Sequence, residues 1–366
     1  MRFDRRLITH FEWGLPLLAL AACALGTMTV YSATHVPGMQ GWSPLALKQL
    51  TWLAGGCVAM LAALAFDYRR LERSAFVVYL IVLAGVIAVP ILGRVGGGSR
   101  RWIPLGPFSI QPSEFMKLGL VIVLARHFAR TYERKLGLRA AVVPMILTGV
   151  PAVLILAQPD LGTVAVLGIV ALTMLVLGGI RLRWFVALGV LVLVAAPFAW
   201  PHLKGYQQKR VLTFLKPEMD PLGAGYHVLQ SKIAVGSGMT WGKGFLRGTQ
   251  NHLNFLPEQH TDFIFSVFAE EWGFVGAMVL VALYLALVLR GLVIAARARD
   301  RFGVLLVLGL TSTVFWQAVI NIGMTTGMLP VVGIPLPFFS YGGSSLLCLL
   351  LGIGLTMNVS MRRFYF

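Results

Sequence analysis

The feature that most constrains this chain is a series of about ten apolar stretches, each long enough to cross a bilayer as a helix. A membrane interior offers no water to backbone N–H and C=O groups, so only helices or closed barrels can span it. The stretches lie at about 13–31, 47–66, 75–92, 115–128, 140–157, 163–180, 184–200, 270–289, 303–326 and 344–360. We therefore predict an all-α polytopic membrane protein with about ten transmembrane helices, forming one domain over residues 1–366.

Short basic clusters between these stretches predict the orientation. The net charge of +17 would also suit a nucleic-acid-binding protein, but the basic residues fall mostly in short loops. That distribution is typical of the positive-inside rule, so we predict both termini in the cytoplasm and no nucleic-acid partner. The opposite side then carries the loops at 93–113, 158–162 and 327–343. It also carries one long extracytoplasmic loop at about 201–261, between the seventh and eighth helices.

Acidic residues crowd the point where this long loop meets the eighth helix. The chain has only 14 acids, and Glu258, Asp262, Glu270 and Glu271 all lie within one short run. A carboxylate at a membrane–water boundary suits general-base catalysis, because partial burial raises its pKa toward the working range. The alternative for Asp262 is a helix-capping role. The alternative for Glu270 and Glu271 is that they are acids at the N-terminus of the eighth helix.

The same region contains residue types that bind metals. His252, Glu258, His260 and Asp262 lie close together in the sequence, but their spacing matches no known zinc motif. We therefore predict no certain cofactor and leave a divalent cation open.

The first outer loop leads into a helix that carries a lysine at membrane depth. Pro112 favours a helix start, and Glu114 and Lys117 are three residues apart, hence on one face. An ammonium inside a membrane needs a partner, and the candidates are Glu114 and Asp160. Lys117 is then part of a structural ion pair or of a cationic wall for an anionic ligand. Asp160 either caps the sixth helix or faces the same cavity.

Two further basic sites have both an ordinary and a functional interpretation. Arg101 beside Trp102 is typical of an interfacial anchor, but a guanidinium next to glycines also suits phosphate. The segment 207–217, which contains Arg210, resembles a short amphipathic helix lying on the outer leaflet. Its bases would contact lipid phosphates in general or one substrate's pyrophosphate. The glycine-rich segment 236–245 is expected to be flexible.

The loop at 329–345 contains three prolines and three glycines. Irregular backbone at membrane depth is tolerated where it lines a cavity or is buried in protein. Ser340, Tyr341 and Ser344 would offer hydroxyl groups to a polar ligand there.

Together these segments resemble the SEDS family of cell-wall polymerases over nearly the whole chain. The matching segments are GGGSRRWIPLG, QPSEFMKLGL, QPDLGT, WGKGFLRGTQNHLNFLPEQHTDFIFSVFAEE and NIGMTTGMLPVVGIPLPFFSYGGSS. The wording of HTDFIFSVFAEE and GMLPVVGIPLPFFSYGG is more similar to the elongation members of the family than to its division members.

The resemblance implies a ten-helix glycosyltransferase at the outer face of the bacterial cytoplasmic membrane. It would polymerise lipid II into β-1,4 glycan strands, releasing undecaprenyl pyrophosphate, with a class B penicillin-binding protein and other membrane proteins of the elongation complex as partners. The family's catalytic acid in HTDFIF is Asp262 here. Our candidates for substrate binding are Arg101, Trp102, Glu114, Lys117, Asp160, Arg210, His260, Thr261, Ser340 and Ser344.

The main alternative is a lipid II flippase. A transporter is expected to place ionisable groups near the bilayer midplane in matching halves. In this sequence they cluster at the outer ends of the helices, which favours an enzyme. A scaffold that only positions a transpeptidase would leave the outward charged cavity without a purpose.

Overall fold

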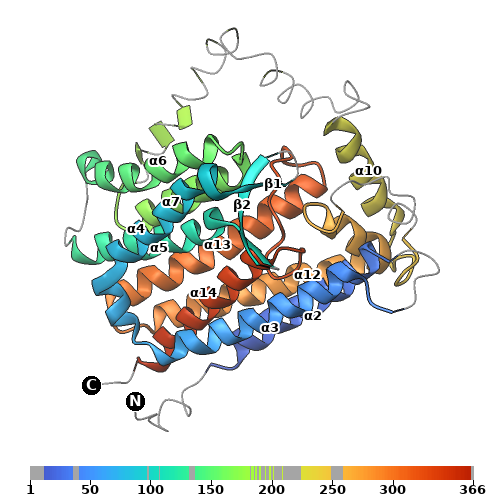
Figure 1. The fold of residues 1–366 in the computed structure, drawn as a ribbon, viewed down its shortest axis with the longest axis horizontal. Helices are drawn as coiled ribbons and strands as arrows, with labels where there is room; N and C mark the ends of the chain where they lie inside the picture. Colours follow the sequence, from blue (N-terminus) through green and yellow to red (C-terminus); the bar gives the residue numbers. More distant parts are fainter. Residues whose placement is uncertain are drawn as a thin grey trace.

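The computed structural model describes residues 12–35, 41–96, 99–106, 108–131, 137–181, scattered positions between 183 and 208, 224–248 and 259–363. Figure 1 shows a bundle of long helices lying roughly side by side. The helices are α2 (Gly14–Ala33), α3 (Pro44–Ala65), α4 (Tyr68–Leu92), α5 (Pro112–Arg130), α6 (Val142–Leu156), α7 (Leu161–Leu177), α10 (Ala224–Ser237), α12 (Ile264–Ala296), α13 (Arg301–Thr325) and α14 (Gly343–Met361), with a 3-10 turn at Leu138–Ala141.

Among the described residues, seven helical segments are long and apolar enough to cross a membrane: α2, α3, α4, α12, α13, α14 and the segment Arg139–Leu156 that contains α6. Of the other three predicted spans, two are described as helices: α5 carries several charges, and α7 is a shorter apolar helix of 17 residues. Every predicted stretch except 184–200 therefore coincides with a described helix, which confirms the polytopic membrane fold. Most of 184–200 lies outside the described residues.

Side-chain caps explain where several of these helices begin. Ser or Asp at the N-cap position accepts a hydrogen bond from a main-chain N–H two or three residues later, which satisfies one of the donors that every helix start leaves open. The cap residues are Ser43 for α3, Asp67 for α4, Asp160 for α7 and Asp300 for α13. Among the described helices, four starts are thus set by local sequence.

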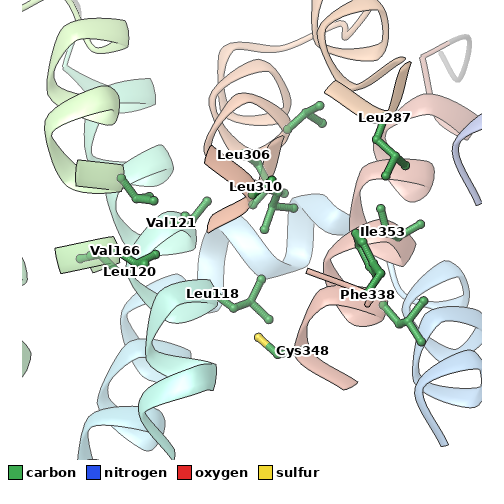
Figure 2. Packing of buried hydrophobic residues seen from close by; sticks show 14 of the residues in the cluster. Leu118, Leu120, Val121, Val166, Leu287, Leu306, Leu310, Phe338, Cys348 and Ile353 are labelled. Atoms are coloured by element: carbon green, nitrogen blue, oxygen red, sulfur yellow. The ribbon is translucent and has the colours of Figure 1, made fainter. Parts of the chain in front are cut away.

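The core lies where α5 is surrounded by other helices. Nearly all of α5 is buried, although it carries charged residues near both ends. In Figure 2, Leu120 of α5 lies beside Val166 of α7. Val121 of α5 packs on α13, since a Cβ atom on Gly309 would lie 2.5 Å from its Cγ1. The lipid-facing residues are therefore on the outer helices, and α5 is an internal helix of the bundle.

The loop predicted at 93–113 contains a small antiparallel sheet, which the sequence analysis did not predict. Its strands are β1 (Arg94–Gly96), β2 (Ser99–Leu105) and β3 (Phe108–Ile110), in the order β1-β2-β3. The glycines of this segment suggested a loop, but Trp102 and Ile103 are residues that favour strands. The fold is otherwise helical across the described residues.

The eighth predicted span is longer than expected, and its helical backbone conformation is interrupted in the first third of the helix. α12 begins at Ile264 rather than 270, and Gly273 within it has φ 65° and ψ −165°, a conformation that only glycine adopts easily. A helix loses main-chain hydrogen bonds at such a break. The segment after α10 supplies replacements: Lys243 N to Glu270 O (3.0 Å), Gly244 N to Glu271 O (2.9 Å), Phe274 N to Met239 O (2.8 Å) and Val275 N to Thr240 O (3.1 Å).

These bonds correct two expectations. The segment 236–245, expected to be flexible, is fixed against α12 because it replaces bonds that the helix lacks. Glu270 and Glu271 are not N-terminal acids, since the first turn of α12 contains no acidic residue. Both are buried deeper in the helix, where Glu270 Oε1 lies 2.6 Å from Lys243 Nζ and Glu271 accepts a hydrogen bond from the Ser32 hydroxyl of α2.

Candidate active site

The segment that leads into α12 is held by its main-chain carbonyl groups. Three consecutive carbonyls each accept a hydrogen bond, two from the loop between α13 and α14 and one from α13 itself. The bonds are Tyr341 N to His260 O (2.9 Å), Ser340 Oγ to Thr261 O (2.6 Å) and Asn321 Nδ2 to Asp262 O (2.9 Å). The backbone beside Asp262 is therefore fixed at three successive positions.

Asn321 makes the contact to Asp262 itself. It is fully buried in α13, and its Nδ2 also donates to Ile334 O at 2.7 Å. One amide thus joins the entry of α12 to the irregular loop that follows α13. Sequence reasoning did not select Asn321, although an amide within an apolar membrane helix is a recognised signal of a buried polar contact.

Ser340 holds the loop together rather than presenting a hydroxyl to the outside. Besides donating to Thr261 O, its Oγ accepts a hydrogen bond from Leu336 N at 2.8 Å. Its carbonyl accepts one from Gln49 Nε2 of α3 at 3.2 Å. Gln49 is fully buried and was also missed by the sequence analysis. The loop 329–345 is thereby anchored to α3 as well as to the segment before α12.

The Asp262 carboxylate lies against the backbone of this same loop. Gly333 has φ 71°, and a Cβ atom added there would lie 3.2 Å from Asp262 Oδ2. Any other residue at position 333 would be strained and would press on the carboxylate. Asp262 is partly exposed, and it stands one residue before Phe263, the N-cap residue of α12.

Two aromatic side chains flank this segment. The rings of His260 and Tyr341 lie 5.7 Å apart between centroids. Burial raises the pKa of the Tyr341 phenol above its usual value, so this hydroxyl stays neutral at physiological pH. The site therefore combines one partly exposed carboxylate with a neutral phenol and an imidazole nearby.

Asp160 forms a second junction between a loop and a helix. Its carboxylate accepts hydrogen bonds from Thr163 N (3.2 Å), Thr163 Oγ1 (2.9 Å) and Gln111 Nε2 (3.1 Å). Arg101 Nη1 lies 3.7 Å from it. The capping interpretation of Asp160 is confirmed, and its carboxylate is engaged from several sides.

Arg101 of β2 forms hydrogen bonds with the main chain of the turn before α7. Its Nε donates to Gln158 O at 3.1 Å, and its Nη2 donates to Pro159 O. The side chain is still 29% exposed, so one face of the guanidinium remains accessible to solvent or a ligand. Its neighbour Trp102 is half-buried on the same strand.

Glu114 is the partner of Lys117. Lys117 Nζ lies 2.9 Å and 2.8 Å from the two carboxylate oxygens of Glu114, and both side chains are buried. Of the two candidate partners, the structure shows Glu114, which lies on the same face of α5 and not, as had been predicted, across the outer cavity, while Asp160 is engaged elsewhere. The Cys348 thiol of α14 donates to the Glu114 carbonyl at 3.3 Å.

This ion pair lines a cavity of about 40 Å³ between α2, α5, α12, α13 and α14. The remaining walls are mostly apolar, and Figure 2 shows Leu118, Leu310, Cys348 and Ile353 around this space. Burial of the lysine in this apolar wall therefore depends on its pairing with Glu114.

Ser344 joins the start of α14 to the outer sheet. Its Oγ accepts a hydrogen bond from Gln111 N at 3.0 Å and donates to Ser109 O at 3.4 Å. Gln111 also reaches Asp160, so Ser344 and Asp160 belong to one structural network. This network and the segment around Asp262 approach each other through the loop after α13, because a Cβ atom on Gly162 would lie 2.5 Å from Val332 O.

Three candidates cannot be placed. Arg210, His252 and Glu258 lie outside the described residues. Within the described residues, no group of three or more His, Cys, Asp or Glu side chains is arranged to hold a metal ion.

Comparisons with known proteins agree with this arrangement over nearly the whole chain. The family model FtsW/RodA/SpoVE, described as cell cycle protein, matches residues 13–365. Peptidoglycan glycosyltransferase MrdB of Escherichia coli is 41% identical over 97% of this chain and 94% of its own length. Stage V sporulation protein E of Bacillus subtilis is 37% identical over 94% of this chain and 96% of its own.

Solved structures show the same fold. A chain from a study of the structural coordination of polymerization and crosslinking by a peptidoglycan synthase complex is 33% identical, with a TM-score of 0.84, covering 97% of this chain and 99% of that one. The crystal structure of the Thermus thermophilus rod shape determining protein RodA is 30% identical, with a TM-score of 0.71, covering 97% and 98%. On the family model, these relatives and the shared fold, the chain belongs to the FtsW/RodA/SpoVE family, the SEDS proteins.

Proposed function

We propose that this protein is a peptidoglycan glycosyltransferase that polymerises lipid II into β-1,4 glycan strands during cell elongation. Relatives that cover nearly the whole chain support the proposal, because they are named peptidoglycan glycosyltransferase MrdB and, in Treponema pallidum at 33% identity, peptidoglycan glycosyltransferase RodA. The single observation that carries the mechanism is the fixed backbone beside Asp262.

The reaction needs one general base. The 4-hydroxyl of the acceptor attacks the anomeric carbon of the lipid-linked donor, the new glycosidic bond forms, and undecaprenyl pyrophosphate leaves with the electron pair. Asp262 takes the proton from the attacking hydroxyl. An α-linked donor gives a β-linked product in one displacement, so one base is sufficient. A base works only if it is held within hydrogen-bond reach of the proton, and three anchored carbonyls provide that positioning.

The leaving group is already charged, so cations stabilise it more effectively than a proton donor. Of the two proposed cations that the structure describes, the Arg101 side chain is the more accessible to a ligand. The Lys117 ammonium is buried and paired with Glu114. Arg210 remains a candidate on sequence grounds. We assign Ser340, Ser344 and Asp160 to fixing the loops of the site. His260, Thr261 and Trp102 are left as the candidates for contact with the sugars.

We further propose that the site faces outward from the bacterial cytoplasmic membrane and works beside a class B penicillin-binding protein. Two features support this arrangement. The basic clusters follow the positive-inside rule, with the Asp262 segment at the opposite ends of the helices. One structural relative comes from a peptidoglycan synthase complex.

The test is incubation of the purified protein, with its transpeptidase partner, with labelled lipid II. Glycan strands longer than the dimer are expected, and the Asp262→Glu variant should make far fewer because the displaced carboxylate loses alignment with the 4-hydroxyl. A protein that moves labelled lipid II across vesicles without polymerising it would be a flippase and would contradict the proposal.

A further inference from the structure

The end of the bundle away from Asp262 carries a compact cluster of arginines. Glu12, just before α2, lies within ion-pair distance of three guanidinium groups that come from two other parts of the chain. The pairs are Arg297 Nη1 at 3.2 Å, Arg363 Nη1 at 3.6 Å and Arg290 Nη1 at 3.9 Å. Among the described residues, three positive charges around one carboxylate leave two in excess.

The cluster has a buried base and an exposed outer part. Glu12 and Arg363 are 17% and 16% exposed, whereas Arg290 and Arg297 are 53% and 57% exposed. The Arg290 guanidinium lies against the start of α2, because a Cβ atom on Gly14 would be 3.3 Å from its Nε. The largely buried Glu12 carboxylate thus holds the arginines in place, and the guanidinium groups of Arg290 and Arg297 are exposed.

The favourable interaction of cations with helix C-termini explains the positions of only some of these arginines. Arg297 follows the C-terminus of α12 and Arg363 follows that of α14, where cations interact favourably with the helix dipole. Arg290 lies about two turns inside α12, beyond the range of that effect. Its position beside Arg297, on one face of the helix, needs another explanation.

Exposed apolar and aromatic residues lie beside the arginines. Val293 lies between Arg290 and Arg297 on the same face of α12 and is 37% exposed. On α2, which packs against α12, Trp13 and Leu17 are each 59% exposed. Trp13, the N-cap residue of α2, lies at the level of Arg290, which lies against Gly14, and Leu17 is one turn deeper in α2, which is the order of a phospholipid from headgroup to acyl chains.

We propose that Arg290 and Arg297, held by Glu12, bind the phosphate of an anionic phospholipid in the leaflet at this end of the bundle. A planar guanidinium forms paired hydrogen bonds with phosphate oxygens, and an excess of two positive charges matches an anionic headgroup. Free phosphate shares the headgroup chemistry, but it would not use Trp13, Leu17 or Val293. The lipid is therefore the ligand that fits both parts of the surface.

The test uses native mass spectrometry of the full-length protein after partial removal of lipid, in micelles containing equal amounts of phosphatidylglycerol and phosphatidylcholine. The wild-type protein should retain phosphatidylglycerol preferentially. Arg290→Gln/Arg297→Gln should lower that preference by about tenfold or more, since it removes the charge-assisted hydrogen bonds that the two guanidinium groups form with the headgroup phosphate. Both positions are more than half exposed, so the variant should fold, which its melting temperature checks.

The matched control is Arg69→Gln/Arg73→Gln, which removes the same charge from exposed positions at the start of α4, at the same end of the bundle. The control should keep the preference. Equal losses in the two variants would show diffuse attraction and overturn the site, as would equal retention of both lipids by the wild type. Displacement of the lipid by millimolar glycerol 1-phosphate would show that phosphate alone is the ligand, and would also overturn it.

Discussion

Two aspartates stand where a loop enters a helix at the same end of the bundle, and the chain uses them differently. The Asp160 carboxylate accepts hydrogen bonds from Thr163 and Gln111 and pairs with Arg101. At Asp262, the anchoring bonds described above go to main-chain carbonyls instead. A carboxylate used as a cap cannot accept a proton without weakening the helix start. Anchoring through the backbone positions a carboxylate without using it as a cap.

The junctions at Asp160 and Asp262 both contact the same stretch of the loop after α13. The segment 332–334 passes between them, with Val332 O close to Gly162 and Gly333 close to the Asp262 carboxylate. Mutations can therefore separate the structural junction at Asp160 from the proposed catalytic one at Asp262 only if stability and activity are both measured.

The largest expected effect concerns the ion pair next to the Asp160 network. Lys117→Met leaves the Glu114 carboxylate buried without its cation, which should lower the free energy of unfolding by about 3–5 kcal/mol. Thermal unfolding in detergent measures this. Glu114→Gln/Lys117→Met removes both charges and should recover most of the loss. An unchanged melting temperature in Lys117→Met would show that the pair has no structural role.

The next effect tests the anchoring of Asp262. Asn321→Leu removes the donor to Asp262 O and Ile334 O, so the base should shift and polymerisation should fall by about 100-fold. Rate measurements with lipid II, alongside melting temperatures, check this.

Gln317→Leu is the matched control, since Gln317 is another fully buried amide on α13. Within the described residues its side chain makes no hydrogen bond. The Gln317→Leu variant should therefore retain its polymerisation rate. Equal rates in the Asn321 and Gln317 variants would show that anchoring through Asn321 does not matter for catalysis.

Asp160→Ala should have a smaller effect, on stability. It removes the α7 cap and the acceptor for Gln111, and loss of an N-cap typically costs about 1–2 kcal/mol. Asp160→Asn should restore most of that, because Asn is nearly as good a cap. Failure of Asn to restore the melting temperature would show that the charge opposite Arg101 matters more than the cap.

The smallest effect is expected at Ser344. Ser344→Ala leaves Gln111 N without its acceptor, so the free energy of unfolding should fall by about 1 kcal/mol while the KM for lipid II stays unchanged. A raised KM with normal stability would show instead that the hydroxyl contacts substrate.

Much of this architecture could be predicted from the sequence, because it depends on local patterns. The length of the apolar stretches predicted the helices, and Pro112 predicted the start of α5. The spacing of Glu114 and Lys117 made Glu114 one of two candidate partners for the lysine, and it is the partner in the structure. Asp160 as a cap is equally local.

The contacts missed from sequence are those between distant segments. Asn321, Gln49 and Ser340 meet the Asp262 segment or its loop only after folding, and nothing in their neighbours reveals the partner. Glu270 and Glu271 were misplaced because an acid pair usually marks a helix start, whereas here Lys243 and Ser32 allow their burial.

The most direct test compares Asp262→Asn with Asp160→Asn, measuring glycan synthesis from lipid II and melting temperature in each purified protein. The account predicts that Asp262→Asn loses about 10²–10⁴-fold in rate, the usual contribution of a general base, without a change in melting temperature. Asp160→Asn should keep its rate within a few-fold, because Asn preserves the cap. Near-normal synthesis by folded Asp262→Asn protein, or equal losses in the two variants, would contradict the assignment of Asp262 as the base.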